Sequence, residues 1–284
     1  MKKTIQIVLV LVGLVTAALN GMDALFWLDP TSGFPLQGGL WLRYGGAAVL
    51  FLLAGAVSLL ASQRVADLIR KQNGIALTAA LTGVIYALTS AMHLTEVVPV
   101  VQQLHAMGRL SASAVLSGCG GALFLAVAGC LGAWALFTQS AFWHSAVPGE
   151  YPAGGVYASV LMVLYPAGLA FERFLGHTSS IYRVYHIWQL LSVLLAMLFL
   201  LGLVRVSFFP ETGRSRGCVR SGLAAFYSCT CCELVFTLCQ WKQGLAGVAQ
   251  AADSLLLAAI GLLGLCCALH MIAPEAARQK ANMD

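Results

Sequence analysis

The sequence predicts an all-α protein, a polytopic transmembrane bundle of about eight helices. Of its 284 residues, 60% are hydrophobic and 10% are charged, whereas soluble domains carry about 25% charged residues. The mean hydropathy is +0.84. Apolar stretches of roughly 20 residues recur along the chain, which is the helix length needed to cross about 30 Å of hydrocarbon. These observations place the protein in the lipid bilayer.

Eight apolar stretches predict the spans of a single integral membrane domain over residues 1–284. Their approximate ranges are 4–26, 40–62, 74–95, 113–137, 155–175, 184–206, 217–239 and 248–270. Lys2 and Lys3 precede the first stretch, as they would in a signal peptide, but no small-x-small cleavage site follows it. We therefore expect the first stretch to be retained as a span.

The distribution of lysine and arginine predicts the orientation, because cytoplasmic loops are enriched in these residues. With the N-terminus inside, eleven of the sixteen fall on the cytoplasmic side: Lys2, Lys3, Arg64, Arg70, Lys71, Arg205, Arg214, Arg216, Arg220, Arg278 and Lys280. An even number of spans returns the C-terminus to the same side. The basic residues form no nucleic-acid motif, so the expected surroundings are a bilayer and other membrane proteins or copies of this chain, with no nucleic acid.

The stretch FWLDPTSGF at 26–34 interrupts the apolar sequence and is predicted to form the first outer turn. Pro30 and Gly33 are turn residues that end the helix. Pro-Thr-Ser-Gly at 30–33 has an echo in Pro-Glu-Thr-Gly at 210–213. The offset carries the first span onto the sixth, so a true repeat would be inverted in the membrane, as in many transporters. A chance match in a Gly- and Ala-rich composition is the alternative.

These two loops also carry a family resemblance. Asp29-Pro30-x-Ser32-Gly33-Phe34, together with Pro210-Glu211-Thr212-Gly213, resembles a pattern in uncharacterised bacterial multi-pass membrane proteins with a D-P-x-[ST]-G-F outer loop. The resemblance covers two short loops and the number of spans. It implies a bacterial inner membrane and brings no known activity.

A polar stripe runs along the third span. Its members recur at helical spacing and are Thr78, Thr82, Tyr86, Thr89, His93 and Glu96. Polar groups that face lipid cost several kcal/mol each, so the stripe must face other helices or water. One interpretation is a seam of hydrogen bonds between helices, and the other is one wall of an outer-facing polar vestibule.

Further ionisable residues are expected at the same outer side. Glu172 and Arg173 end the fifth span, His186 begins the sixth, and Arg43 and Arg183 lie near span ends. Each could serve as an interfacial anchor or could pair with an opposite charge inside the bundle. The candidate vestibule consists of Tyr86, Thr89, His93, Glu96, Glu172, Arg173, His186 and Glu233.

Glu233 is the candidate with the clearest functional signal. It lies about six residues inside the predicted outer end of the seventh span, where a carboxylate is costly and marks a functional site by default. It therefore needs a partner or a bound proton. Arg173, Arg183 and His186 are the expected partners.

Metal and cofactor signals are weak. Nine cysteines fall mostly inside spans, and four thiolates from one straight helix cannot surround zinc tetrahedrally. The sequence holds no G-x-x-x-x-G-K-[ST], H-E-x-x-H, G-x-S-x-G or C-x-x-C-H motif. The prediction leans against an enzyme and includes no metal and no cofactor.

Three functions remain open from the sequence. A non-catalytic membrane partner or assembly subunit requires the least of the residues and is our first expectation. A transporter or permease for a small molecule or ion is the alternative, supported by the polar stripe, Glu233 and Pro166 within the fifth span. A membrane redox protein with b-type haem between His93 and His186 is the third.

Overall fold

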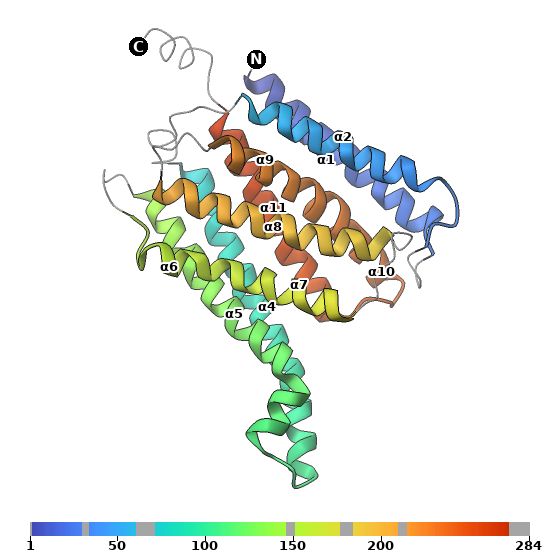
Figure 1. Cartoon of the computed structure of the whole chain (residues 1–284), viewed down its shortest axis with the longest axis vertical. Helices are drawn as coiled ribbons and strands as arrows, with labels where there is room; N and C mark the ends of the chain where they lie inside the picture. Colours follow the sequence, from blue (N-terminus) through green and yellow to red (C-terminus); the bar gives the residue numbers. More distant parts are fainter. Residues whose placement is uncertain are drawn as a thin grey trace.

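The computed structural model describes residues 2–29, 34–60, 72–145, 151–176, 184–209 and 215–272. These residues form a bundle of helices (Figure 1). No β-strand occurs in the described ranges, and Leu28 and Pro35 form an isolated antiparallel β-bridge. The predicted all-α bundle is confirmed.

The helices follow the predicted spans in order. Their bounds are α1 Lys2–Met22 continued by the π-helix η1 Asp23–Trp27, α2 Leu40–Ser58, α4 Asn73–Ala106, α5 Ala112–His144, α6 Gly155–Val160 continued by the 3-10 turn η2 Leu161–Val163 and by α7 Leu164–Gly176, α8 Val184–Phe208, α9 Ser215–Ala225 continued by the π-helix η4 Phe226–Glu233 and by α10 Leu234–Lys242, and α11 Val248–Met271.

Within the described residues, seven helical segments are long and apolar enough to cross a membrane. The second predicted span is shorter, because the apolar helix there covers Arg43–Ser58. The start of α1 lies beside the end of α11, where the Gln6 side chain donates a hydrogen bond to the Leu269 carbonyl oxygen (3.2 Å). The first and last spans therefore begin and end at one side, which we call the terminal end.

The opposite side is marked by a projecting hairpin of α4 and α5 (Figure 1). At this side α4 continues past the predicted range 74–95 to Ala106, because polar residues that end the apolar run, such as Gln102 and Gln103, still favour helix. α5 begins at Ala112, close to the predicted 113, and exceeds its predicted range at the other end, where it continues to His144. A helix of 34 residues is about 51 Å long, against about 30 Å of hydrocarbon. The hairpin tip at 107–111 therefore extends beyond the bilayer, and we call this side the hairpin end.

Burial separates a central group of helices from peripheral ones. In the most apolar window of each span, 72% of the residues are buried in Ser215–Lys242 and 67% in Val248–Met271, against 11% in Thr4–Trp27. The helices α9, η4, α10 and α11 thus form the core, while α1 and α2 lie at one edge (Figure 1), where α1 packs on η4 and α2 packs on α9. Polar residues on the central helices are shielded from lipid and must find partners inside the protein.

Two glycines allow α9 and α11 to pack closely. A Cβ atom on Gly264 would lie 2.5 Å from the Gly222 carbonyl oxygen, and one on Gly222 would lie 2.8 Å from the Gly264 carbonyl oxygen. Such contacts are too short for any side chain, and neither backbone can move without disturbing the core. Small residues at this position therefore determine the separation of the two helices.

Replacing Gly264 by valine is expected to lower the free energy of unfolding by roughly 1–3 kcal/mol, because it overpacks the contact between α9 and α11. The matched control is Gly55→Val on α2, where nothing lies within 4 Å of the added Cβ, and it is expected to change stability by less than about 0.5 kcal/mol. Unfolding by denaturing detergent, followed by circular dichroism, measures both variants. Equal effects of the two substitutions would contradict the proposed close packing.

Several predicted features lie outside the described residues. These are the Pro-Thr-Ser-Gly and Pro-Glu-Thr-Gly segments at 30–33 and 210–213, and with them the proposed inverted repeat. Arg183 lies outside as well.

Candidate functional site

A buried ion pair joins the fifth and seventh spans. The Arg173 guanidinium on α7 donates to Glu233 Oε1 at 2.6 Å and to the Gln189 carbonyl oxygen at 2.6 Å. The Glu233 side chain is fully buried and that of Arg173 is 10% exposed. Arg173 is therefore the partner that the isolated carboxylate in the seventh span was predicted to need. The other carboxylate oxygen, Oε2, is buried and has no hydrogen-bond partner among the described residues.

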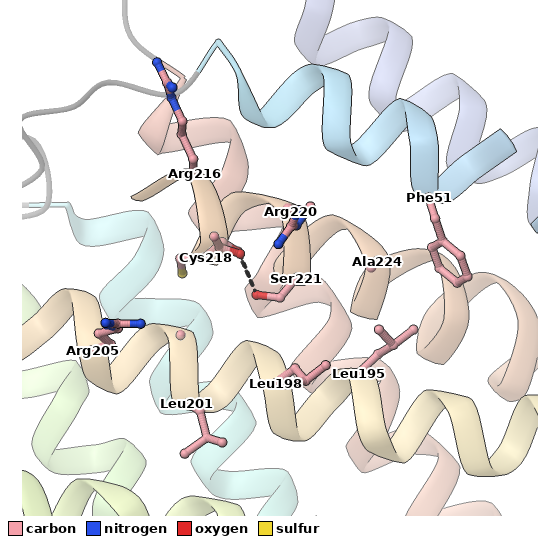
Figure 2. Close-up of a pocket in the computed structure, with 12 residues that line it drawn as sticks. Phe51, Leu195, Leu198, Leu201, Arg205, Arg216, Cys218, Arg220, Ser221 and Ala224 are labelled. Carbon is pink, nitrogen blue, oxygen red and sulfur yellow. Dashed lines mark hydrogen bonds between the residues drawn. The ribbon is translucent and has the colours of Figure 1, made fainter. Parts of the chain in front are cut away.

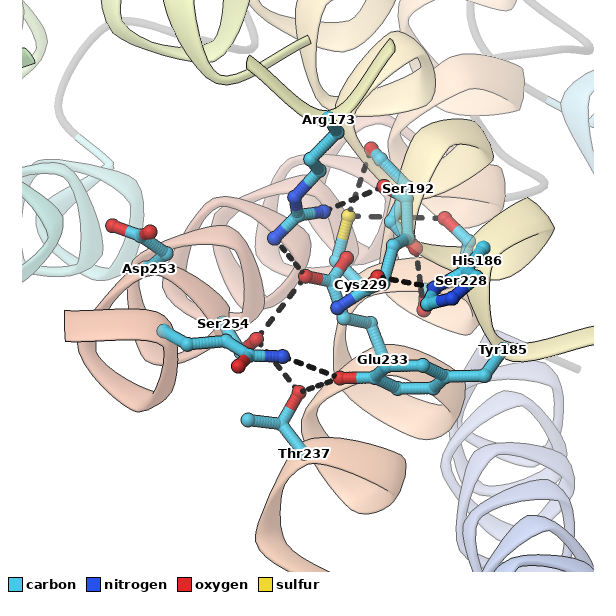
Figure 3. A network of polar contacts seen from close by, with 12 residues as sticks. Arg173, Tyr185, His186, Ser192, Ser228, Cys229, Glu233, Thr237, Asp253 and Ser254 are labelled. Carbon is cyan, nitrogen blue, oxygen red and sulfur yellow. Dashed lines mark hydrogen bonds and ion pairs between the residues drawn. The ribbon is translucent and has the colours of Figure 1, made fainter. Parts of the chain in front are cut away.

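A chain of hydroxyl groups leads from Glu233 towards the hairpin end (Figure 3). Ser254 on α11 donates to Glu233 Oε1 (3.1 Å), and its oxygen lies 2.8 Å from Thr237 Oγ1. Thr237 in turn lies 3.2 Å from the Tyr185 hydroxyl, which accepts a hydrogen bond from the Gln250 amide (3.0 Å). Each hydroxyl can donate and accept, so the row is a continuous hydrogen-bonded path to a buried carboxylate.

A second carboxylate, Asp253, lies next to Ser254 on α11 and is also buried. Its Oδ1 atom accepts a hydrogen bond from the Tyr165 hydroxyl and lies 3.0 Å from His93 Nε2. The other ring nitrogen of His93, Nδ1, lies 3.3 Å from Glu96 Oε2. The Glu96 side chain is 51% exposed, so this branch connects a buried carboxylate to the surface.

Because Asp253 and Ser254 are consecutive, α11 holds the two branches side by side. We call the whole set the carboxylate network; its members are His93, Glu96, Tyr165, Arg173, Tyr185, Glu233, Thr237, Gln250, Asp253 and Ser254. No side-chain hydrogen bond joins the two carboxylates directly among the described residues. They are coupled through space, since Arg173 acts electrostatically on Asp253 as well as on Glu233.

The carboxylate network has more acidic than basic side chains and can therefore bind a proton. The His93 ring can donate to both Asp253 and Glu96 only in its doubly protonated, cationic form. Even then, Arg173 and His93 face three carboxylates, and Glu172 on α7 adds a further negative charge facing His93 and Asp253. The network can therefore bind another cation, of which a proton is the smallest, without becoming positive.

The helices are irregular where they position these groups. Glu233 ends the π-helix η4, and Arg173 follows the 3-10 turn η2 and Pro166 in the same span. A π-helical or 3-10 segment replaces regular backbone bonds and is frequent at functional sites and hinges. The 3-10 turn at 161–163 lies just before Pro166, and α7 continues through the proline as regular α-helix.

The structure separates the predicted vestibule residues into three groups. His93, Glu96, Arg173 and Glu233 belong to the carboxylate network. Glu172 is exposed and His186 is half-buried beside Gln189. Tyr86 and Thr89 are buried and do not join the hydrogen bonds of the network. Tyr86 donates to the Met162 carbonyl oxygen (2.7 Å) and packs edge-on against Tyr165 (ring centroids 5.7 Å), and Thr89 bonds its own helix.

The polar stripe therefore has two parts. Between Thr78 and Thr89, side chains bond backbone carbonyl groups of their own helix or of a neighbour, such as Ala259 opposite Thr82. This part matches the interpretation as a seam between helices. At His93 and Glu96 the stripe joins the carboxylate network, which matches the interpretation as the wall of a polar site.

Neither Asp253 nor Tyr165 was among the residues predicted for the site. Glu233 was expected to be the only deep carboxylate, and this prediction is wrong. Asp253 stands alone in the apolar run Ala-Ala-Asp-Ser-Leu-Leu-Leu at 251–257, a signal of the same kind as Glu233. Its distance from the start of the span makes it resemble an interfacial residue. Only the folded structure, in which His93 on α4 and the Tyr165 hydroxyl on α7 reach Asp253, shows that it is enclosed.

A separate ion pair joins the first two spans. The Arg43 guanidinium on α2 donates to both carboxylate oxygens of Asp23, at distances from 2.6 to 3.1 Å. Asp23 begins the π-helix η1. The pair makes no hydrogen bond to members of the carboxylate network, and it fastens α2 to α1.

The structure also bears on metal binding and on the candidate haem ligand His93. No group of three or more His, Cys, Asp or Glu side chains that could hold a metal occurs in the described part of the chain. Both ring nitrogens of His93 contact other side chains, so His93 would have to give up these contacts to bind haem iron. The cysteines of η4 are buried in the core, where they act as small apolar residues.

Comparisons of the chain with models of known protein families, with curated proteins and with solved structures find no match. The residues of the carboxylate network are therefore the basis for any functional conclusion.

Proposed function

We propose that this protein is a proton-coupled carrier for a small solute in a bacterial inner membrane. The observation that carries the proposal is a pair of buried carboxylates with different partners: Glu233 is paired with the buried Arg173, and Asp253 contacts Tyr165 and His93. Rows of hydrogen-bonding groups lead from both carboxylates. Ionisable groups enclosed in a bundle are costly and mark ion or proton pathways. A purely structural pair would not need two carboxylates and two rows of titratable or hydroxyl groups.

The geometry suggests how proton binding could be coupled to a solute. A proton that enters through Glu96 and His93 neutralises Asp253, and one that passes along the hydroxyl row neutralises Glu233. Neutral Glu233 no longer holds the Arg173 guanidinium by charge. Arg173 then becomes available to a carboxylate or phosphate on the solute, which a guanidinium binds in a bidentate manner.

The interrupted helices supply the places where the bundle could change shape. The 3-10 turn at 161–163 ends ten residues before Arg173, almost three helical turns away, and η4 ends at Glu233 itself. Discontinuous helices at the binding site are a common feature of secondary transporters. Hinge motion at these two positions would expose the ion pair first to one side of the membrane and then to the other.

A charge-displacement recording from proteoliposomes tests the proposal without knowledge of the solute. The protein is adsorbed on a solid-supported membrane, and the outer solution is switched rapidly to lower pH. A carrier with this network is expected to give a transient inward current that protein-free liposomes lack. A wild-type protein without such a current, in either orientation and with its helical circular dichroism intact, would overturn proton coupling.

The second candidate, a non-catalytic assembly subunit, is favoured by the projecting hairpin of α4 and α5. Its apolar side chains Met107 and Leu110 are exposed at the tip, which extends beyond the bilayer. This candidate predicts no current in the recording above. It also predicts that shortening the hairpin abolishes the biological role, whereas a carrier would keep its current.

We further propose that the terminal end faces the cytoplasm, as the lysine and arginine distribution indicates. An epitope inserted after Gly108, whose φ of +63° marks the hairpin turn, is expected to bind antibody on intact spheroplasts. An epitope at the C-terminus is expected to bind only after permeabilisation. The reverse pattern would contradict the assigned orientation.

A further inference from the structure

A groove opens at the terminal end of the bundle. The carboxylate network lies towards the opposite, hairpin end. Its volume is about 680 Å³, within the usual range of ligand sites. It is bounded by α8, by α9 and by Phe51 on α2 (Figure 2). The groove is therefore formed by two consecutive helices, α8 and α9, and by α2 from the first part of the chain.

The groove is elongated, and its walls are mostly apolar. Leu195, Leu198 and Leu201 line it along α8, with Ala224 and Phe51 opposite. From Leu195 to Arg205, ten residues of helix extend about 15 Å, which is about half of the hydrocarbon thickness. The shape and polarity suit an alkyl chain that lies parallel to the spans.

Three arginines line the end of the groove nearest the helix termini. Arg205 lies three residues before the end of α8, and Arg216 and Arg220 lie in the first turns of α9. Arg216 and Arg220 are four residues apart and share one helix face. All three side chains are exposed, and none forms an ion pair with an acidic side chain in the described ranges. Their charge is therefore available to an anion.

We propose that this groove binds an anionic phospholipid, with its headgroup among the exposed side chains of Arg205, Arg216 and Arg220 and one acyl chain along the leucines of α8. Guanidinium groups bind phosphate through paired hydrogen bonds, and basic pockets between transmembrane helices bind anionic headgroups. A free phosphate would leave the apolar length of the groove unused. With the assigned orientation, the lipid comes from the cytoplasmic leaflet.

The first test is native mass spectrometry of the protein in detergent with added phosphatidylglycerol or phosphatidylcholine. The wild-type protein is expected to retain phosphatidylglycerol preferentially, and the double variant Arg216→Gln, Arg220→Gln is expected to bind it at least about fivefold more weakly. The control Arg109→Gln changes an exposed arginine at the hairpin tip and is expected to bind as the wild type does. Equal retention of the two lipids, or an unchanged double variant, would overturn the proposal.

Two further measurements separate a lipid site from a site for a soluble anion. Excess inorganic phosphate is expected to leave the bound phosphatidylglycerol in place, because it replaces only the headgroup contacts. Leu198→Asn, which adds a polar group to the apolar wall, is expected to weaken lipid retention while the arginines remain. Displacement by phosphate alone, together with an unaffected Leu198→Asn variant, would assign the groove to a soluble anion instead. Detergent unfolding without lipid verifies that each variant is folded.

Discussion

Replacing Glu233 by alanine is expected to lower the free energy of unfolding by about 3–5 kcal/mol. The substitution leaves the Arg173 guanidinium buried without its carboxylate, and breaking a buried ion pair from one side carries a penalty of this size. The lost hydrogen bond from Ser254 adds to the effect. The loss would be measured as the shift in unfolding by denaturing detergent, followed by circular dichroism.

Two variants show whether the ion pair is the cause. The double variant Arg173→Met, Glu233→Leu removes both charges and is expected to recover most of the stability, because apolar residues of similar volume can replace a buried pair. Glu172→Ala, next to Arg173 but exposed, is expected to change stability by less than about 0.5 kcal/mol. A Glu233→Ala protein as stable as the wild type would show that Arg173 and Glu233 are not paired inside the bundle.

Asp253→Asn is expected to reduce the current evoked by an acid jump by at least about tenfold, because an amide can accept hydrogen bonds from Tyr165 and His93 but cannot bind a proton. The hydrogen-bond geometry around the site is otherwise kept. Charge-displacement recordings of the variant and the wild type in matched liposomes measure the effect. A current of wild-type size would remove Asp253 from the proton path.

Asp23→Asn is the matched control for this experiment. The two aspartates are similarly buried, at 8% and 6% exposure for Asp23 and Asp253, and each accepts hydrogen bonds from a cationic or polar side chain. Asp23 pairs with Arg43 instead of the carboxylate network. The control is therefore expected to keep the current, and a loss in both variants would point to a general defect of folding or insertion.

The order and type of the helices could be predicted from composition and hydropathy alone. A bilayer allows few structures other than helices over apolar runs of this length, so each predicted range coincides with a helix. The lengths of α4 and α5 could not be predicted in this way, because hydropathy ends at the membrane surface while helix propensity continues through residues such as Gln102 and Gln103.

The candidate site was predicted in part. Glu233 and His93 stood out because ionisable groups in apolar runs need partners, and Arg173 was among the partners expected for Glu233. Asp253 and Tyr165 could not be assigned, because their role depends on the fold, which brings His93 on α4 and Tyr165 on α7 to Asp253 on α11. The π-helical segment that carries Glu233 could not be predicted either, because the register of backbone hydrogen bonds leaves no clear pattern in the sequence.

The close glycine contact between α9 and α11 links the fold to the site. α11 carries Asp253 and Ser254, and α9 continues through η4 to Glu233. The separation of these helices at Gly222 and Gly264 therefore influences the position of Glu233 relative to Ser254. This arrangement is consistent with a network held by the best-packed helices of the bundle, as preorganised sites require.

The most direct measurement is infrared difference spectroscopy of the protein in lipid, recorded while the pH of the solution on the hairpin side is lowered. We expect the absorption band of protonated carboxyl groups to grow, while the amide bands of the helices stay constant. One component of the carboxyl band is expected to be absent in Asp253→Asn and another in Glu233→Gln. Carboxyl bands that are the same in the wild type and in both variants would contradict proton binding by the network.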